Sequence, residues 1–318
     1  MAKASQILNL IKAHFSENEE SFKTAALQVA AHEAKLGHAE VAKELKKLVL
    51  KQPKKPIRLR SAQKRQLADL VFERTAKHRL SELVVDEQLR EKIKRIISEY
   101  HRKDEFLDFG LQNRKKILLS GPPGTGKTLT ASIISNELNL PLYVVMMDRL
   151  ITRYLGETSA KLRQVFDLIR EERGVYLFDE FDAIGAQRGR DHEVGEMRRV
   201  LNSFLQFIEE DESDSLIIAA TNTVEILDQA LFRRFDDVLT YRKPDYEQAK
   251  KLIQQRLSNF DNEFDLTNLK KNLQDLSHAD IAKACDNAVK QCILEGIQTI
   301  SSEHIKSAIQ ERRQMYQN

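Results

Sequence analysis

One glycine-rich octet restricts the fold of this chain more than any other feature. It reads Gly121, Pro122, Pro123, Gly124, Thr125, Gly126, Lys127 and Thr128. An apolar stretch ending at Ser120 precedes it, and a helix-forming stretch through Leu138 follows it. The glycines let backbone N–H groups turn inward around an anion, and the following helix N-terminus adds its positive dipole end. This order of strand, G-x-x-x-x-G-K-T and helix predicts a phosphate-binding loop.

The last residues of the octet predict which ligands the loop takes. Lys127 is expected to reach the β- and γ-phosphates of ATP, and the Thr128 hydroxyl is expected to ligate Mg²⁺. Leu129 follows in the first turn of the helix and is included among the nucleotide-binding residues. ATP and Mg²⁺ are therefore the predicted ligands.

Two carboxylates close the next strongly apolar stretch. Val175–Phe178 predicts a buried strand, and Asp179 and Glu180 follow it directly. At the carboxyl end of a parallel strand these side chains face the phosphate crevice. Asp179 is expected to hold Mg²⁺ through water, and Glu180 is expected to polarise the attacking water. The pair predicts an ATP-hydrolysing enzyme.

Helices alternate with short apolar strands from about Lys77 onward, which predicts an α/β fold. The expected strands are Lys116–Ser120, Leu142–Met146, Val175–Phe178, Leu216–Ala220 and Val238–Tyr241. Such alternation favours a parallel sheet covered by helices on both faces. After Pro244 the pattern is helical only. We therefore predict an ATPase core over residues 77–243 and a small all-α lid over residues 244–318.

The N-terminal part of the chain has a different character. Apolar spacing over residues 1–50 predicts three helices, the second ending at Gly37, in a small domain for binding a partner or substrate. Residues 51–76 predict a basic linker, because residues 51–60 combine two prolines with dense positive charge. Two interpretations of this linker stay open: a solvated tether, or a contact with an acidic partner or nucleic acid.

Composition limits the cellular context. The chain has 318 residues, of which 41% are hydrophobic and 31% charged, as in ordinary globular proteins. A net charge of +3 does not by itself imply nucleic-acid binding. No apolar run approaches a membrane span, and the N-terminus lacks a signal-peptide core. Cys285 and Cys292 lie about 10 Å apart on one predicted helix, too far to bridge. A cytoplasmic protein without a membrane contact is expected.

Several segments together resemble the AAA subgroup of the AAA+ ATPases, over roughly residues 80–308. Asp179–Gly185, followed by Gln187-Arg188-Gly189, is similar to the segment after the second Walker motif of that subgroup. Ala219-Ala220-Thr221-Asn222 is similar to its sensor-1 strand. The resemblance implies a P-loop ATPase fold in which Asn222 helps to orient the water near the γ-phosphate.

Residues 227–236 resemble the arginine-finger segment of the same family and include Arg233 and Arg234. The resemblance implies that these arginines contact the ATP of a neighbouring subunit, in a homo-oligomer that is most often a hexamer. The family usually separates its two arginines by two residues, whereas here they are adjacent. Arg234, next to Phe235 and Asp236, is therefore the preferred finger.

Two segments, the lid motif and the adenine-edge segment, resemble the family but differ from its usual residues. Ser277-His278-Ala279-Asp280-Ile281 resembles the lid motif, but His278 stands where the family usually has glycine. The stretch Ser81–Val84 resembles the adenine-edge segment, although it departs from the usual Asp-Ile-Gly. The resemblance implies nucleotide contacts at Leu83, Val84, His278 and Ala279.

A pore signal suggests what the ATPase acts on. Tyr154-Leu155-Gly156 resembles the aromatic–hydrophobic–glycine loop that lines the pore of protein-threading AAA rings. An aromatic side chain can grip an extended chain without reading its sequence. Protein unfolding, translocation or remodelling is the leading prediction, with Tyr154 and Leu155 contacting substrate. The alternatives are an ATP-dependent assembly or signalling switch and an ATPase acting on nucleic acid; the basic linker alone favours the latter.

The sequence contains no protease motif of its own. His32-Glu33 is not followed by a histidine at the H-E-x-x-H spacing, and no G-x-S-x-G elbow is present. Any proteolysis is therefore expected to come from a separate protease partner. The helical N-terminus with one AAA module also resembles small bacterial ATPases paired with subtilisin-like serine proteases in phage defence.

Overall fold

The computed structural model describes residues 19–38, 40–43, 46, 67, 69–151, 155–184, 191–223, 232–258, 260–263, 266–297 and 299–315. The chain divides into two compact units, Met1–Arg58 and Leu59–Asn318. In the first, α2 (Glu19–Lys35) is the second predicted helix and ends before Gly37, whose φ of 89° favours glycine. The first predicted helix lies outside the described residues; of the third, residues 40–43 and 46 are described, as helix.

A six-stranded sheet forms the centre of the second unit, with strand order β1-β3-β4-β5-β2-β6. The strands are β1 (Val71–Arg74), β2 (Lys116–Ser120), β3 (Leu142–Val145), β4 (Val175–Phe178), β5 (Leu216–Thr221) and β6 (Asp237–Thr240). All five predicted strands are present, with bounds within a residue of those predicted. They pair in parallel, so their carboxyl ends lie along one edge of the sheet.

The sixth strand corrects two predictions. β1 pairs antiparallel with β3 at the sheet edge, so the sheet is mixed rather than wholly parallel. It also lies within the predicted linker 51–76, so the sheet begins before residue 77. Only Val71 of this strand is buried, and Phe72 is exposed. An edge strand with one buried residue lacks the continuous apolar run that marks an interior parallel strand.

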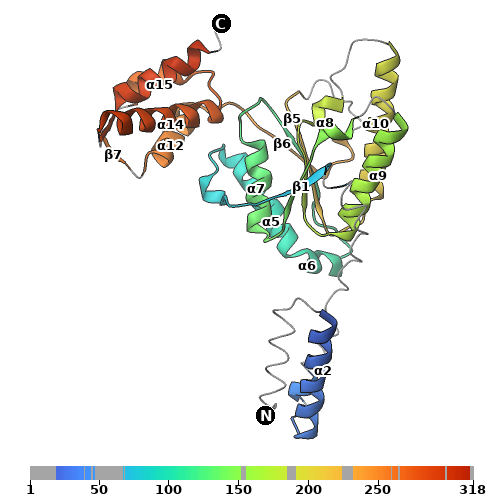
Figure 1. Ribbon diagram of the computed structural model, residues 1–318. Helices are drawn as coiled ribbons and strands as arrows, with labels where there is room; N and C mark the ends of the chain where they lie inside the picture. Colours follow the sequence, from blue (N-terminus) through green and yellow to red (C-terminus); the bar gives the residue numbers. More distant parts are fainter. Residues whose placement is uncertain are drawn as a thin grey trace. The chain divides into compact units, whose positions relative to one another are not determined.

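Helices cover both faces of the sheet (Figure 1). On one face lie α5 (Glu87–His101) and α7 (Lys127–Glu137); on the other lie α9 (Leu155–Glu171) and α10 (Asp191–Glu210). Two short helices, α6 (Lys103–Asp108) and α8 (Met147–Leu150), complete this part. The core under α9 and α10 is aromatic, since the Phe204 ring contacts Phe166, Phe178 and Phe181. This packing holds the strand ends that carry the polar site residues.

The C-terminal part is helical with one small sheet. Its helices are α12 (Tyr246–Arg256), α13 (Lys270–Leu273), α14 (His278–Glu295) and α15 (Ser302–Gln314). The prediction of an all-helical lid is corrected by β7 (Asp261–Glu263) and β8 (Thr299–Ser301), which pair in parallel. Both strands have three residues, too few to show an alternating pattern in the sequence.

Two predictions about context can be compared with this fold. Cys285 and Cys292 on α14 are buried free thiols, as the helix spacing predicted. None of the helices in the described part of the chain is long and apolar enough to cross a membrane.

Candidate active site

The phosphate loop connects β2 to α7, and its glycines adopt backbone conformations that other residues rarely take. Gly121, Gly124 and Gly126 have φ values of 143°, 72° and 103°. A Cβ on Gly121 would lie 2.4 Å from the carbonyl oxygen of Tyr241, which no side chain could tolerate. Backbone conformation therefore favours glycine at all three positions, and close contacts exclude a side chain at Gly121 and Gly124.

Lys127 is held at the centre of this loop by three neutral oxygen atoms. Its Nζ donates to the carbonyl oxygens of Gly121 at 2.7 Å and Pro122 at 2.9 Å, and to Oδ1 of Asn222 at 2.8 Å. Burial lowers the pKa of the ammonium, while the nearby carboxylates of Asp179 and Asp182 act in the opposite direction. A buried cation with only neutral ligands would gain strongly from a phosphate oxygen.

Thr128 and Asp179 form the candidate magnesium site. The Thr128 hydroxyl donates to Oδ2 of Asp179 at 2.7 Å, which joins the start of α7 to the end of β4. Both are hard oxygen ligands, and Mg²⁺ is commonly held by one or two protein oxygens plus water and phosphate. This donor set fits Mg²⁺. In the described ranges no group of three or more histidine, cysteine or acidic residues could hold a metal ion by itself.

Glu180 and Asn222 lie at the carboxyl ends of neighbouring strands β4 and β5, and both are exposed. Glu180 has a φ of 54°, and its N–H donates to Oδ1 of Asp179 at 3.0 Å. Strained backbone of this kind clusters at functional sites. Asp182, to which the sequence analysis gave no role, accepts the Asn222 N–H at 3.2 Å and so joins the two strand ends.

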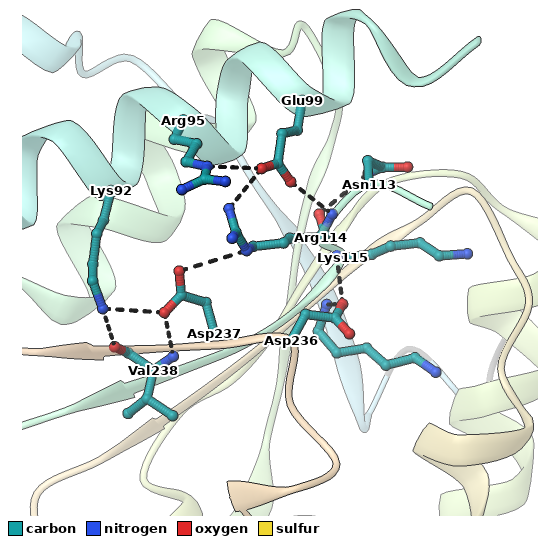
Figure 2. A network of polar contacts seen from close by, with 10 residues as sticks. Lys92, Arg95, Glu99, Asn113, Arg114, Lys115, Asp236, Asp237 and Val238 are labelled. Carbon is teal, nitrogen blue, oxygen red and sulfur yellow. Dashed lines mark hydrogen bonds and ion pairs between the residues drawn. The ribbon is translucent and has the colours of Figure 1, made fainter. Parts of the chain in front are cut away.

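The arginine segment lies before β6. Nε of Arg234 lies 2.7 Å from Oε1 of Glu209 on α10, an ion pair without hydrogen-bond alignment. Arg233 is exposed, and Phe235 is buried in the aromatic core. Residues 227–231 of the segment lie outside the described residues. The two residues after Phe235, Asp236 and Asp237, belong to the polar network drawn in Figure 2.

The lid contacts the phosphate loop directly. The Ala279 N–H donates to the carbonyl oxygen of Gly124 at 2.9 Å. Ser277 and Asp280 form a capping box at the start of α14, and Nε of Arg312 on α15 donates to Oδ1 of Asp280 at 2.9 Å. Sequence reasoning missed Arg312, because its pairing with Asp280 depends on how α14 and α15 pack.

Three residues with predicted nucleotide contacts are buried or partly buried: Leu83 and Val84 of the adenine-edge segment and His278 of the lid motif. Leu83 packs in the core under α5 and α7, whereas Val84 packs in the lid core. Burial lowers the pKa of the His278 imidazole, while the neighbouring Val84 backbone acts in the opposite direction. Leu83 lies near the phosphate loop, because a Cβ added to Gly126 would lie 3.7 Å from Cδ1 of Leu83. These positions are compatible with the predicted base contacts, which stay predictions.

Two cavities flank the contact between the lid and the phosphate loop. One of about 630 Å³ is lined by Pro122, Pro123 and Gly124 together with lid residues that include Arg312. The other, of about 640 Å³, is lined by His278, Tyr241 and the start of α5. The first adjoins the loop itself, so it is the more direct route to the phosphate site.

The predicted pore residues Tyr154 and Leu155 lie at the start of α9 or before it. Tyr154 lies outside the described residues, and Leu155 is the first residue of α9. Their contact with substrate therefore stays a prediction.

Three features together define a P-loop ATPase site. They are the phosphate loop with its buried lysine, the hydroxyl–carboxylate pair, and the glutamate beside that pair. A model of the ATPase family associated with various cellular activities (AAA) matches residues 117–243. The AAA family ATPase y4kL of Sinorhizobium fredii is 34% identical over 302 residues, covering 92% of this chain and 91% of that protein. The chain belongs to the AAA family of ATPases.

Two other relatives combine an ATPase module with further sequence. A proteasome-activating nucleotidase of Methanopyrus kandleri is 34% identical over 236 residues, covering 71% of this chain and 54% of that protein. An ATP-dependent zinc metalloprotease FtsH of Helicobacter felis is 29% identical over 245 residues, covering 74% of this chain and 38% of that protein. This chain thus spans only about half or less of these two relatives.

Substitutions at Lys127 and Glu180 should separate ATP binding from hydrolysis. We expect Lys127→Ala to lose ATP binding, because the buried cation is removed from the phosphate site. Glu180→Gln should bind ATP but hydrolyse it at least about 100-fold more slowly, because the amide cannot polarise water as the carboxylate does. Binding of a fluorescent ATP analogue and phosphate release measure the two effects. Turnover near the wild-type rate in Glu180→Gln would exclude its assigned role.

Glycine substitutions should show that the lid contact matters for nucleotide binding. A Cβ on Gly124 would lie 2.6 Å from Oγ of Ser277, so Gly124→Ala should push the lid away and weaken ATP binding. Gly110 has nearly the same φ, 70° against 72°, but no atom within 4 Å of an added Cβ. Gly110→Ala should therefore cost about 1–2 kcal/mol of stability and leave ATP affinity unchanged. Equal ATP affinity in both variants would contradict this assignment.

Proposed function

We propose that this ATPase assembles into a ring and uses ATP hydrolysis to unfold, translocate or remodel a protein substrate. The observation that carries the proposal is the position of Arg234 relative to β2. Asp236, two residues after Arg234, bonds to Lys115 and Lys116 at the amino end of β2. The phosphate loop begins at the other end of that strand.

This separation supports a finger that acts on another subunit. The five residues of β2 span roughly 16 Å, beyond the reach of an arginine side chain. The Arg234 side chain therefore does not reach the phosphate loop of its own chain in this fold. In a head-to-tail arrangement it would lie near the phosphate loop of a neighbouring subunit. A closed ring, a hexamer by family resemblance, satisfies every site in this way.

Each polar residue has a distinct role in the proposed reaction. Lys127 holds the β- and γ-phosphate oxygens, and Thr128 and Asp179 hold Mg²⁺, which when bound neutralises phosphate charge. Glu180 orients a water for attack on the γ-phosphorus as the bond to ADP breaks, and Asn222 helps to place that water. Arg234 of the neighbour stabilises the charge of the transition state, an effect of roughly 10³–10⁵ in related phosphoryl transfer.

The relatives support a protein as the substrate. One relative is named a proteasome-activating nucleotidase and another an ATP-dependent zinc metalloprotease. The first name links a nucleotidase to the proteasome, and the second links ATP to a protease. The sequence here contains neither the H-E-x-x-H nor the G-x-S-x-G protease motif. We therefore propose that this ATPase delivers its protein substrate to a separate protease or activates that protease. A role beside such a protease in phage defence is the most specific form of this proposal, and the resemblance of the helical N-terminus supports it.

Mixing two inactive variants tests whether the finger acts in trans. Glu180→Gln supplies a finger but has a blocked site, whereas Arg234→Ala has an intact site but no finger. Neither should hydrolyse ATP alone, and their mixture should recover part of the wild-type rate at interfaces between the two kinds of subunit. Absence of recovery in particles shown to contain both variants would contradict the trans arrangement.

Substitution of Tyr154 tests the action on protein. We expect Tyr154→Ala to keep most basal ATPase activity and to lose the stimulation given by unfolded casein. Loss of the ring should remove about 1.5–3 kcal/mol of apolar grip. Tyr154→Phe, which keeps the ring, should retain the stimulation. Unchanged stimulation in a well-folded Tyr154→Ala protein would contradict threading and favour the assembly or signalling switch.

A further inference from the structure

Asp236 is fastened to the start of β2 by three hydrogen bonds. Its Oδ2 accepts the N–H of Lys115 at 2.8 Å and that of Lys116 at 2.9 Å. Its own N–H donates to the carbonyl oxygen of Lys116 at 2.7 Å. The Asp236 side chain lies beside Lys115 in Figure 2. We call these three bonds the Asp236 clamp.

The clamp is one of three contacts that hold the arginine segment, beside the buried Phe235 and the ion pair of Arg234 with Glu209 on α10. β6 is the last strand of the sheet and pairs only with β2 in the described part of the chain. The regular ladder begins after the clamp, where Asp237 pairs with Ile117. Before it, Phe235 is buried and anchors the segment on one side. Arg234 is therefore two residues from the clamp and one from this apolar anchor.

A second set of contacts surrounds the clamp but involves other atoms. Asp237 accepts from Nζ of Lys92 on α5 at 3.2 Å, and Glu99 on the same helix pairs with Arg114 at 2.6 Å. In Figure 2 the first pair joins α5 to the start of β6, and the second joins α5 to Arg114, which lies just before β2. Both pairs are partly exposed, so each is expected to contribute little stability by itself. Asp237 therefore offers a neighbouring carboxylate for comparison with Asp236.

We propose that Asp236 is a positioning residue for the arginine pair: it ties Arg234 to the strand that ends in the chain's own phosphate loop. The proposal rests on the proposed trans function of Arg234. β2 carries the phosphate loop at one end and the clamp at the other. The same strand therefore positions both the nucleotide site and the arginine finger of each subunit. Loosening the clamp should displace the finger without altering the site of the same chain.

The experiment uses the mixture of Glu180→Gln and Arg234→Ala subunits as its background. In that mixture the Glu180→Gln subunit supplies the finger, so a change placed on it reports on finger position alone. Asp236→Ala on this subunit should lower the recovered rate roughly 10- to 100-fold, as expected for a misplaced catalytic group. Asp236→Asn should restore it, because both N–H groups bond to one oxygen that the amide carbonyl can replace.

Two further variants make the test specific to the finger. Asp237→Ala on the Glu180→Gln subunit should leave the recovered rate within about twofold of the background, because its partly exposed ion pair with Lys92 does not touch the arginine segment. Asp236→Ala placed instead on the Arg234→Ala subunit should also leave it unchanged, since that subunit has no finger to misplace. A general folding defect would lower the rate from either subunit. Melting temperature and binding of a fluorescent ATP analogue complete the comparison.

The outcomes separate this inference from the function on which it rests. If the background mixture recovers no activity, the trans function fails first. If the background recovers but Asp236→Ala on the finger subunit matches it, the positioning role is wrong. Equal losses from Asp236→Ala on either subunit, or no rescue by Asp236→Asn, would also overturn it. Loss confined to the finger subunit, with rescue by asparagine, supports it.

Discussion

Parallel pairing of β2 with a strand on each side is the constraint from which the rest of this site follows. β5 and β6 both run in the direction of β2, so polar residues after the strands gather at one edge. Lys127 then reaches Asn222, although the two are 95 residues apart in the chain. The same pairing brings the start of β6 to the start of β2 and places the arginine segment at the opposite edge. One strand thus connects the phosphate loop to the segment of the proposed arginine finger.

Electrostatics inside the phosphate loop explain how nucleotide can change this arrangement. The Lys127 ammonium is buried and satisfied by neutral oxygens, one of which belongs to Asn222. A phosphate would be a stronger partner for the cation, so we propose that its arrival frees the Asn222 side chain for the predicted contact with water. The lid contact between Ala279 and Gly124 uses the same loop from the other side. The phosphate loop therefore connects to the sensor-1 strand through Lys127 and Asn222, and to the lid through Gly124 and Ala279.

Much of this could be predicted from the sequence, because the informative signals are local. The octet, the Asp179-Glu180 pair and the interior strands each lie within a short, strongly patterned stretch. The missed features depend on packing or length. β1 is an exposed edge strand, β7 and β8 have three residues each, and the Asp236 clamp joins positions 120 and 121 residues apart. Such a clamp can be recognised only once the register of β6 against β2 is known.

We propose that each active site is completed by a second copy of the chain, and a dilution series tests this arrangement. Specific ATPase activity is measured at saturating ATP over a wide range of protein concentration, beside the mass of the particles under the same conditions. We expect activity to fall in step with the loss of oligomer and the monomer to be nearly inactive. A monomer that hydrolyses ATP at the full specific rate would contradict it.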